Sequence, residues 1–181
     1  QRPGSVFAPI HWTDQLASAA RIDALVGAVT DPVSGQPEMK AAPVALRRFK
    51  AAWFGFAIAR ERFTGIAAEY WSLAPAKSGW RLEVAGLANP PDWTKYARGL
   101  LGLHETGAAE LLAYHDDRSG QHRFAAFAGD SLIGALFIAR EPVAASRSWA
   151  ADRLGQGVTH GRDRLAILAG RAGGDNARDN D

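Results

Sequence analysis

The chain has 181 residues, of which 47% are hydrophobic, so it is long enough and apolar enough for one ordinary globular domain or two small ones. Its formal net charge of +2 does not predict nucleic-acid binding, and it has no run of about 18 apolar residues that could cross a membrane. The absence of cysteine excludes disulfides, thiolate nucleophiles and cysteine-bound iron–sulfur clusters, and it fits a cytoplasmic protein. Because the chain starts at Gln1 without a leader pattern, we expect it to begin at an internal boundary.

Residues 1–48 predict the short elements of a β-rich region. Residues 6–10 and 43–46 are apolar runs of strand length, and Thr13 is placed to cap a brief helix. Residues 31–37 are dense in Asp, Pro, Ser and Gly, which predicts an exposed loop. This stretch has too few apolar residues to close a core, so we expect it to be the end of a larger β domain.

Residues 49–68 predict a connector. The apolar, aromatic run at 53–58 is bracketed by the cations Arg47, Arg48, Lys50, Arg60 and Arg62. We expect the aromatic side chains to pack and the cations to face solvent. The alternative is a patch that faces a phosphate or a partner.

Residues 69–170 predict a small α+β domain with a mainly antiparallel sheet. Residues 70–73 and 80–84 alternate in polarity about a turn, which predicts a hairpin. Residues 111–138 read as a three-stranded meander with its first turn at 117–120. We therefore expect this range to close its own core and to resist proteolysis.

Helices are predicted between and after these strands. Asp92 is placed to cap a helix over 93–101, Ser146 to cap another, and residues 164–168 form a last short one. Residues 171–181 have no large apolar side chain, so burial cannot offset their ordering entropy and we expect a disordered linker.

The common catalytic motifs are missing from the sequence: it has no phosphate-binding Gly loop, no Gly-x-Ser-x-Gly and no His-Glu-x-x-His. On the predicted meander, His115 and His122 are cross-strand neighbours that could bind a metal through imidazole nitrogens. A polar hairpin tip in solvent explains the same residues without a metal, and we favour that interpretation.

Two strings near the start carry a family resemblance. Pro3-Gly-Ser-Val-Phe-Ala-Pro-Ile-His-Trp12 and Thr30-Asp-Pro-Val-Ser-Gly-Gln-Pro-Glu-Met-Lys40, followed by Pro43-Val44, resemble the C-terminal pterin-dinucleotide-binding domain of the molybdopterin oxidoreductase (DMSO reductase) superfamily. Their pairing looks most like bacterial assimilatory nitrate reductases. The strings cover about a quarter of the chain in the right order.

The resemblance implies that residues 1–48 are the end of a β-barrel that closes over two molybdopterin guanine dinucleotides. The position matching Lys40 contacts the cofactor, which suits an ammonium donor. The position matching Asp23 is usually a cofactor-contacting Asn, and an ionised Asp cannot donate and would repel a pyrophosphate. Ile10, His11 and Trp12 fall where the family lines its substrate funnel, or else plug the barrel.

Beyond residue 50 the resemblance is looser. Strings like Trp53-Phe-Gly-Phe56 and Ser131-Leu-Ile-Gly-Ala135 are similar to an extra small domain of assimilatory nitrate reductases, some of which continue into a [2Fe–2S] domain. The family's molybdenum-ligand region and its cysteine motif are not in this sequence.

The function that the resemblance implies is reduction of nitrate to nitrite at molybdenum. In that enzyme this chain supplies cofactor binding and an accessory domain and holds no iron–sulfur cluster itself. Its expected partners are the remainder of the polypeptide and an electron donor protein or domain, with no nucleic acid and no membrane. The alternatives are another molybdopterin enzyme, such as a formate dehydrogenase, and a non-catalytic docking module.

Overall fold

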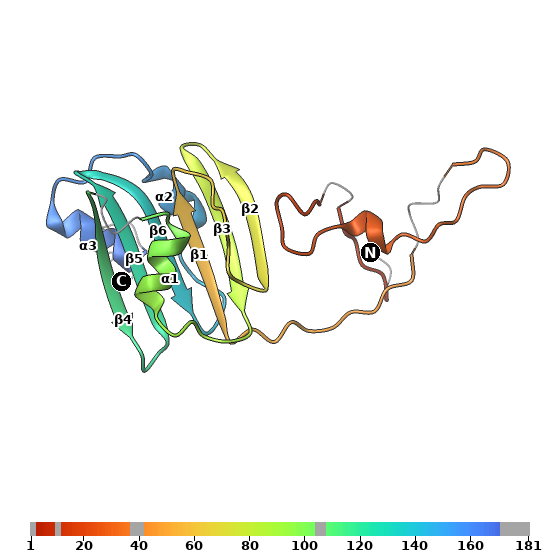
Figure 1. Cartoon of the computed structure of the whole chain (residues 1–181), viewed down its shortest axis with the longest axis horizontal. Helices are drawn as coiled ribbons and strands as arrows, with labels where there is room; N and C mark the ends of the chain where they lie inside the picture. The colour runs from red at the N-terminus through yellow and green to blue at the C-terminus, as the bar shows by residue number, and fades with distance from the viewer. Residues whose placement is uncertain (1–2, 10–11, 37–41, 104–107, 171–181) are drawn as a thin grey trace, which may run out of the picture. The chain divides into compact units, whose positions relative to one another are not determined.

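A computed structural model describes residues 3–9, 12–36, 42–103 and 108–170 (Figure 1). The chain divides into two compact units, Gln1–Lys50 and Ala51–Asp181, here called the N-terminal unit and the sheet unit. Within the described ranges, no helix combines the length and apolarity that a membrane crossing requires. Each unit is built differently.

The described residues of the N-terminal unit include one short element, the 3-10 helix η1 (Ile22–Leu25), and no strand. The predicted strands at 6–10 and 43–46 are therefore wrong over their described residues, which are irregular. The helix expected after Thr13 is only a turn, in which the Thr13 carbonyl accepts from the amides of Leu16 and Ala17, both at 3.2 Å. A short apolar run has no ladder hydrogen bonds of its own and becomes a strand only beside another.

The predicted loop at 31–37 is confirmed over its described residues, which are exposed. The Asp31 carboxylate accepts from the amides of Val33 at 2.9 Å and Ser34 at 2.6 Å, forming a local turn. The hydrogen bond from the Ser34 amide, with those from the Ser34 hydroxyl and the Val33 amide, lowers the pKa of Asp31.

The sheet unit is built on one open antiparallel sheet of six strands in the order β2-β3-β1-β6-β5-β4 (Figure 1). The strands are β1 (Trp53–Ala59), β2 (Tyr70–Ala76), β3 (Gly79–Gly86), β4 (Ala109–Asp116), β5 (Gln121–Ala128) and β6 (Ser131–Ala139). The predicted hairpin, β2–β3, and the predicted meander, β4–β5–β6, are both confirmed as antiparallel pairs of neighbouring strands. The predicted mainly antiparallel sheet is confirmed with them.

The central strand β1 lies in the range expected to be a connector. It pairs with β3 on one side and with β6 on the other, joining hairpin and meander into one sheet. Its run, Trp-Phe-Gly-Phe-Ala-Ile-Ala, is buried on both faces and therefore does not alternate in polarity. Continuous apolar runs cannot be assigned by periodicity alone, which is why the sequence pattern did not show a strand.

Three helices cover the sheet, α1 (Trp93–Leu100) on one face and α2 (Arg147–Asp152) and α3 (Gly161–Ala169) on the other (Figure 1). The predicted caps are confirmed. The Asp92 carboxylate accepts from the Lys95 amide at 2.9 Å, and the Ser146 hydroxyl from the Trp149 amide at 3.4 Å.

Two hydrophobic cores result, one on each face of the sheet. The core under α1 includes Trp53, Leu82, Phe124 and Leu136, and the core under α2 and α3 includes Phe56, Phe127, Leu132 and Ile167. All the buried residues of both cores lie between residues 53 and 168.

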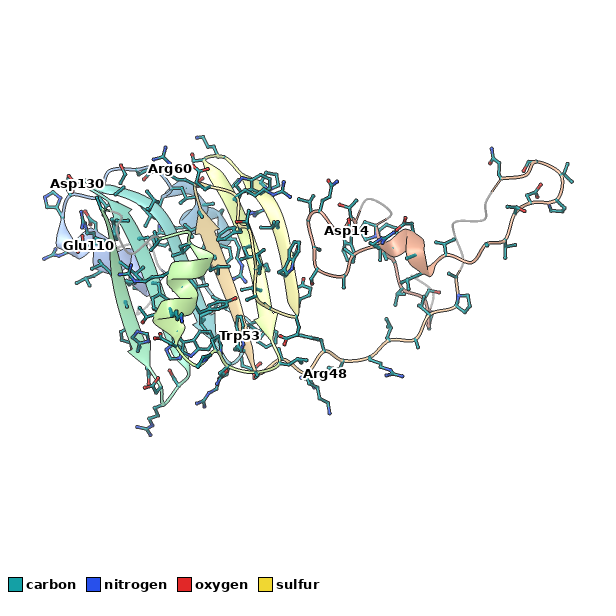
Figure 2. The ribbon with its side chains drawn as sticks, viewed as in Figure 1. Asp14, Arg48, Trp53, Arg60, Glu110 and Asp130 are labelled. Atoms are coloured by element: carbon teal, nitrogen blue, oxygen red, sulfur yellow. The ribbon has the colours of Figure 1, made fainter. Side chains whose placement is uncertain are left out.

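Trp53, at the start of β1, is a central residue of the core under α1 (Figure 2). It is 3% exposed, its Nε1 donates to the Ala88 carbonyl at 2.8 Å, and it meets Trp93 edge-on at 5.2 Å between ring centroids. Its partner across the ladder is Gly86, where an added Cβ would lie 2.4 Å from Nε1. The ring therefore packs directly against the glycine backbone.

Candidate functional site

The cofactor residues implied by the resemblance lie in the N-terminal unit. Ile10, His11 and Lys40 fall outside the described residues. Trp12 is 52% exposed, and Asp23 lies exposed in η1. No described contact brings Trp12 and Asp23 together, so their role remains a prediction.

The described N-terminal unit exposes its apolar side chains. Its exposed large hydrophobic residues are Val6, Phe7, Trp12, Leu16, Leu25, Val29, Val33, Val44, Leu46 and Phe49, and its one described buried hydrophobic residue is Ala20. Most of the large hydrophobic side chains in the described part of this unit therefore lie outside a core.

The sheet unit brings one chemically distinctive pair together, His115 and His122, at the tip of the β4–β5 hairpin. The two residues face each other across the ladder, as predicted, and their Nδ1 atoms are 3.0 Å apart. The hairpin turn is held by Asp116, whose carboxylate accepts from the Ser119 hydroxyl at 2.7 Å and from its amide at 3.2 Å. The turn thereby fixes the register that makes the imidazoles neighbours.

His122 is buried under the first turn of α1. It is 4% exposed and stacks on Trp93, with ring centroids 5.0 Å apart and an interplanar angle of 25°. The exposed His115 has its Nε2 atom 3.4 Å from the Thr94 hydroxyl. The first two residues of α1 thus rest on the two imidazoles.

This arrangement determines the protonation of the pair. An Nδ1···Nδ1 hydrogen bond needs one protonated and one bare nitrogen, so the bond carries a single proton. Burial lowers the pKa of His122, and the neighbouring His115 lowers it further, while Asp117 and Asp116 act in the opposite direction. His122 is therefore neutral at pH 7.

The pair has little support for metal binding. Within the ranges that the structure describes, no three His, Asp or Glu side chains are grouped as metal ligands. The stable sites of transition metals in proteins usually have at least three protein ligands. The favoured interpretation, a polar hairpin tip, needs one correction, since His122 is buried and not in solvent.

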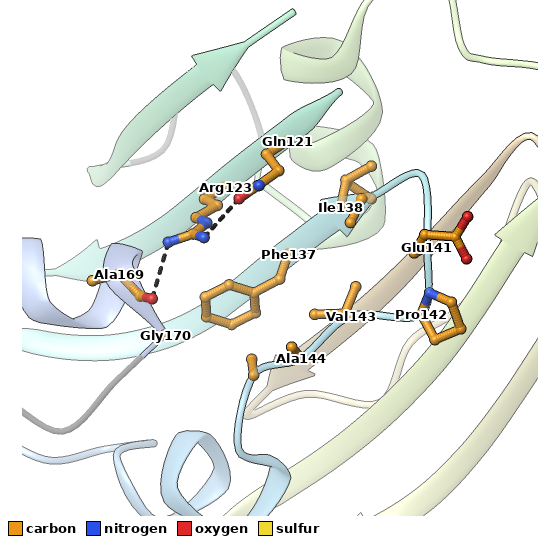
Figure 3. A pocket seen from close by; sticks show the side chains of 12 residues that line it. Gln121, Arg123, Phe137, Ile138, Glu141, Pro142, Val143, Ala144, Ala169 and Gly170 are labelled. Atoms are coloured by element: carbon orange, nitrogen blue, oxygen red, sulfur yellow. Dashed lines mark hydrogen bonds between the residues drawn. The ribbon is translucent and has the colours of Figure 1, made fainter. Parts of the chain in front are cut away.

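A small cavity lies beside the C-terminus of α3 (Figure 3). It has a volume of about 290 Å³ and is lined by Arg123, Phe137, Glu141 and Val143 among others. The Arg123 guanidinium donates to the carbonyls of Leu168 at 3.1 Å and Ala169 at 2.9 Å, and to the Gln121 side chain at 2.8 Å. This arginine therefore neutralises the carbonyl end of α3, a structural role.

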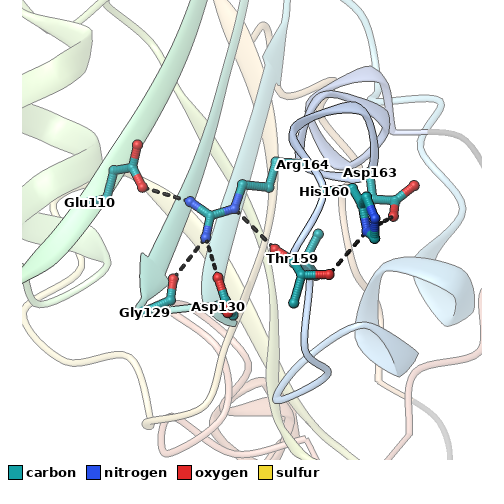
Figure 4. A network of polar contacts seen from close by, with 8 residues as sticks. Glu110, Gly129, Asp130, Thr159, His160, Asp163 and Arg164 are labelled. Atoms are coloured by element: carbon teal, nitrogen blue, oxygen red, sulfur yellow. Dashed lines mark hydrogen bonds and ion pairs between the residues drawn. The ribbon is translucent and has the colours of Figure 1, made fainter.

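Arg164 of α3 is the centre of a polar network that joins the helix to the sheet (Figure 4). Its guanidinium donates to Glu110 at 2.7 Å, to Asp130 at 3.0 Å, and to the carbonyls of Gly129 at 2.9 Å and Val158 at 3.1 Å. It also lies 4.6 Å from the centroid of the Phe127 ring. Four of the five guanidinium N–H groups have an acceptor, so this network ties α3 to the sheet.

A similar ion pair fixes α2. The Arg147 guanidinium meets Glu83 of β3 with two hydrogen bonds, at 2.9 and 3.1 Å, and lies over the Phe56 ring. Neither arginine network was predicted, because the paired residues are 54 and 64 positions apart in the sequence. The only local signal was the position of each arginine in a predicted helix beside apolar residues.

Comparison with known proteins gives one informative relative. No family model matches the chain, and no solved structure matches it. The chain is 32% identical over 179 residues to a nitrate reductase of Klebsiella oxytoca, in an alignment that covers 96% of this chain and 19% of that protein. The chain is therefore homologous to part of a nitrate reductase and spans about a fifth of its length, which confirms the expected relationship.

Proposed function

We propose that this chain, the homologue of one part of a nitrate reductase, is the C-terminal part of a molybdenum-dependent assimilatory enzyme that reduces nitrate to nitrite. Its N-terminal unit would complete the barrel that closes over molybdopterin guanine dinucleotide. The molybdenum–pterin group supplies the oxygen-atom and two-electron transfer when bound, and the residues of this chain contribute binding. A Cys-free sequence is consistent with a cytoplasmic enzyme.

The observation that carries this proposal is the exposed apolar surface of the N-terminal unit. Phe7, Trp12 and Leu46 are side chains that proteins ordinarily bury, and the described part of this unit has no sheet or core to bury them. The relative has four-fifths of its length outside the alignment, enough chain to supply the covering surface and the missing strand partners. We place the remainder of the enzyme polypeptide there.

The residues of the N-terminal unit fit the cofactor unevenly. Lys40 carries a compact cation that can donate to a phosphate or a pterin carbonyl, and Trp12 offers an exposed ring for stacking. The Asp23 carboxylate only accepts hydrogen bonds when ionised, so it does not fit a pyrophosphate. We therefore assign the phosphate contact to Lys40 and none to Asp23.

The test is Lys40→Ala in the complete enzyme, with Lys50→Ala as a control at another cation of the same unit. Loss of one charge-assisted hydrogen bond of about 1.5–3 kcal/mol should weaken cofactor retention roughly 10- to 150-fold. Molybdenum and guanine nucleotide content per polypeptide measure retention, and nitrate turnover measures the consequence. Wild-type content and turnover in Lys40→Ala, with the control also unchanged, would remove Lys40 from the cofactor site.

The substrate is tested separately. The complete enzyme should reduce nitrate and should not oxidise formate, since the formate dehydrogenase alternative has a similar barrel end. This chain alone should bind no molybdenum and turn over neither substrate, because the other contacts to the cofactor lie in the remainder of the enzyme. Nitrate reduction by the isolated chain would contradict the proposal.

A second function, docking of an electron donor, is favoured for the sheet unit by its two self-contained cores. A unit that closes its own cores does not depend on the barrel for folding and is free to present its surface to a partner. Deleting residues 51–181 from the complete enzyme should leave nitrate reduction with dithionite-reduced methyl viologen and abolish reduction driven by the protein donor. An equal loss of nitrate reduction with both electron donors would show that the sheet unit supports the barrel instead.

A further inference from the structure

We infer that His115 and His122 form an acid-sensitive latch for α1, closed while the two imidazoles share one proton and opened when both are protonated. This inference concerns the sheet unit alone and does not depend on the proposed enzyme activity. The geometry that carries it is the 3.0 Å separation between the Nδ1 atoms together with the burial of His122 beneath Trp93.

The closed state follows from the hydrogen bond itself. With one proton between the two Nδ1 atoms, one nitrogen donates to the other and the bond is formed. When both imidazoles are protonated, two Nδ1–H groups point at each other and two cations lie in one contact. The bond must then break and one ring must move.

The charged groups on the elements around the pair do not prevent this opening of the latch on protonation. They are Asp92 and Lys95 of α1, Asp116, Asp117 and Arg118 of the hairpin turn, and Arg140 after β6. The Asp92 carboxylate accepts a hydrogen bond from the Lys95 amide, and the Asp116 carboxylate accepts one from the Ser119 hydroxyl. The Arg140 guanidinium donates to the Asp117 carbonyl, which adds a cation near the turn. Asp117 and Asp116 raise the pKa of His122, but burial and the neighbouring His115 lower it by more.

Movement of His122 has a direct consequence for α1, because Trp93 and Thr94 are its first two residues. Trp93 stacks on His122, and Thr94 reaches His115. The same turn forms a wall of a cavity of about 360 Å³. That cavity is lined by Gly65, Pro90, Pro91, Lys95, Tyr96 and Leu100, among others. Opening the latch would therefore release the turn and reshape this cavity.

The direction of the pH effect follows from linkage. His122 has a lowered pKa in the closed state, so the open state, with a value nearer the ordinary 6.5, binds the extra proton more readily. The contribution of the neutral His122 to the stability of the closed latch is fully present above pH 6.5 and is lost as the pH falls below 6.5. The opening equilibrium should increase by up to about tenfold for each pH unit, the slope for one proton.

Hydrogen exchange of the intact chain between pH 7.5 and 5 measures this opening. The Tyr96 amide, bonded to the Asp92 carbonyl in α1, should lose protection by up to about tenfold per pH unit below 6.5, after correction for intrinsic rates. The Ala150 amide makes the equivalent bond to the Ser146 carbonyl in α2, whose core contains no histidine among the described residues, and it should keep its protection. Loss of amide protection at both helices together, or at neither helix, would overturn the proposal of a latch.

Two variants assign the effect to the pair. His122→Phe keeps a ring under Trp93 without a titrating nitrogen, and the pH-dependent loss at Tyr96 should disappear. His115→Asn changes the exposed partner, so it remains informative if the first variant folds poorly. Its amide oxygen can accept from a protonated His122, and the loss should be reduced. A loss that persists unchanged in a folded variant at either position would also overturn the latch.

Discussion

The two units of this chain differ in what their apolar residues do. In the sheet unit, Trp53, Phe56 and Phe124 are buried in cores made only of residues from that unit. In the N-terminal unit, Phe7, Trp12 and Leu46 are exposed. Similar side chains are thus buried in the sheet unit and exposed in the N-terminal unit. The sheet unit therefore carries its own interior, whereas the described N-terminal unit buries only Ala20 among its hydrophobic residues.

The largest expected effect comes from separating the units at two different points. A fragment of residues 51–170 should fold, because it retains both cores, whereas a fragment of residues 69–170 should not. The second cut removes β1, the strand that joins β3 to β6. Circular dichroism and thermal unfolding of the fragments check this. A cooperative transition in the 69–170 fragment would contradict the central role of β1.

The second prediction compares two tryptophans in the isolated chain. Trp53→Ala should lower the free energy of unfolding by about 3–5 kcal/mol, because it empties a packed site in the core under α1. Trp12→Ala should change it by less than about 0.5 kcal/mol, because its ring is half exposed. Denaturant titration measures both. Comparable losses would mean that the N-terminal unit has an interior of its own.

The third prediction concerns the network that ties α3 to the sheet. Arg164→Met keeps the alkyl stem but removes the guanidinium, and it should cost about 2–3 kcal/mol, a value kept low because Glu110 and Asp130 are solvent-exposed. Arg162→Met on the same helix, at an exposed position, should be nearly neutral. Urea midpoints of the two variants give the contrast. Equal midpoints would remove the network from the account of stability.

The smallest effect is expected at the helix caps. Asp92→Ala should cost about 1 kcal/mol by removing the 2.9 Å bond to the Lys95 amide. Ser146→Ala should cost less, because its bond to the Trp149 amide is longer, at 3.4 Å. The reverse order of cost, measured by thermal unfolding, would show that bond length does not rank these caps.

Much of the sheet unit could be predicted because its signals are local. The hairpin β2–β3 follows from alternation about a turn, and α1 follows from Asp92 before an amphipathic run. The strand β1 was missed because its apolar run has no alternation. The predicted strands of the N-terminal unit were wrong over the described residues because a strand depends on a neighbour that a local pattern does not contain.

For the candidate sites, the sequence determined residue types and local spacing. It predicted that His115 and His122 would be cross-strand neighbours, and its strings carried the relationship to nitrate reductases that the homology confirms. Only the tertiary structure decided that α1 packs over this hairpin and buries His122 beneath Trp93. Likewise, only the fold brought Arg164 to Glu110 and Asp130. The physical reason is the range of the contacts. Turns, helix caps and the register within a hairpin depend on residues that are near in sequence. Burial and charge pairing depend on distant elements, which are brought together only by the packing of the whole sheet.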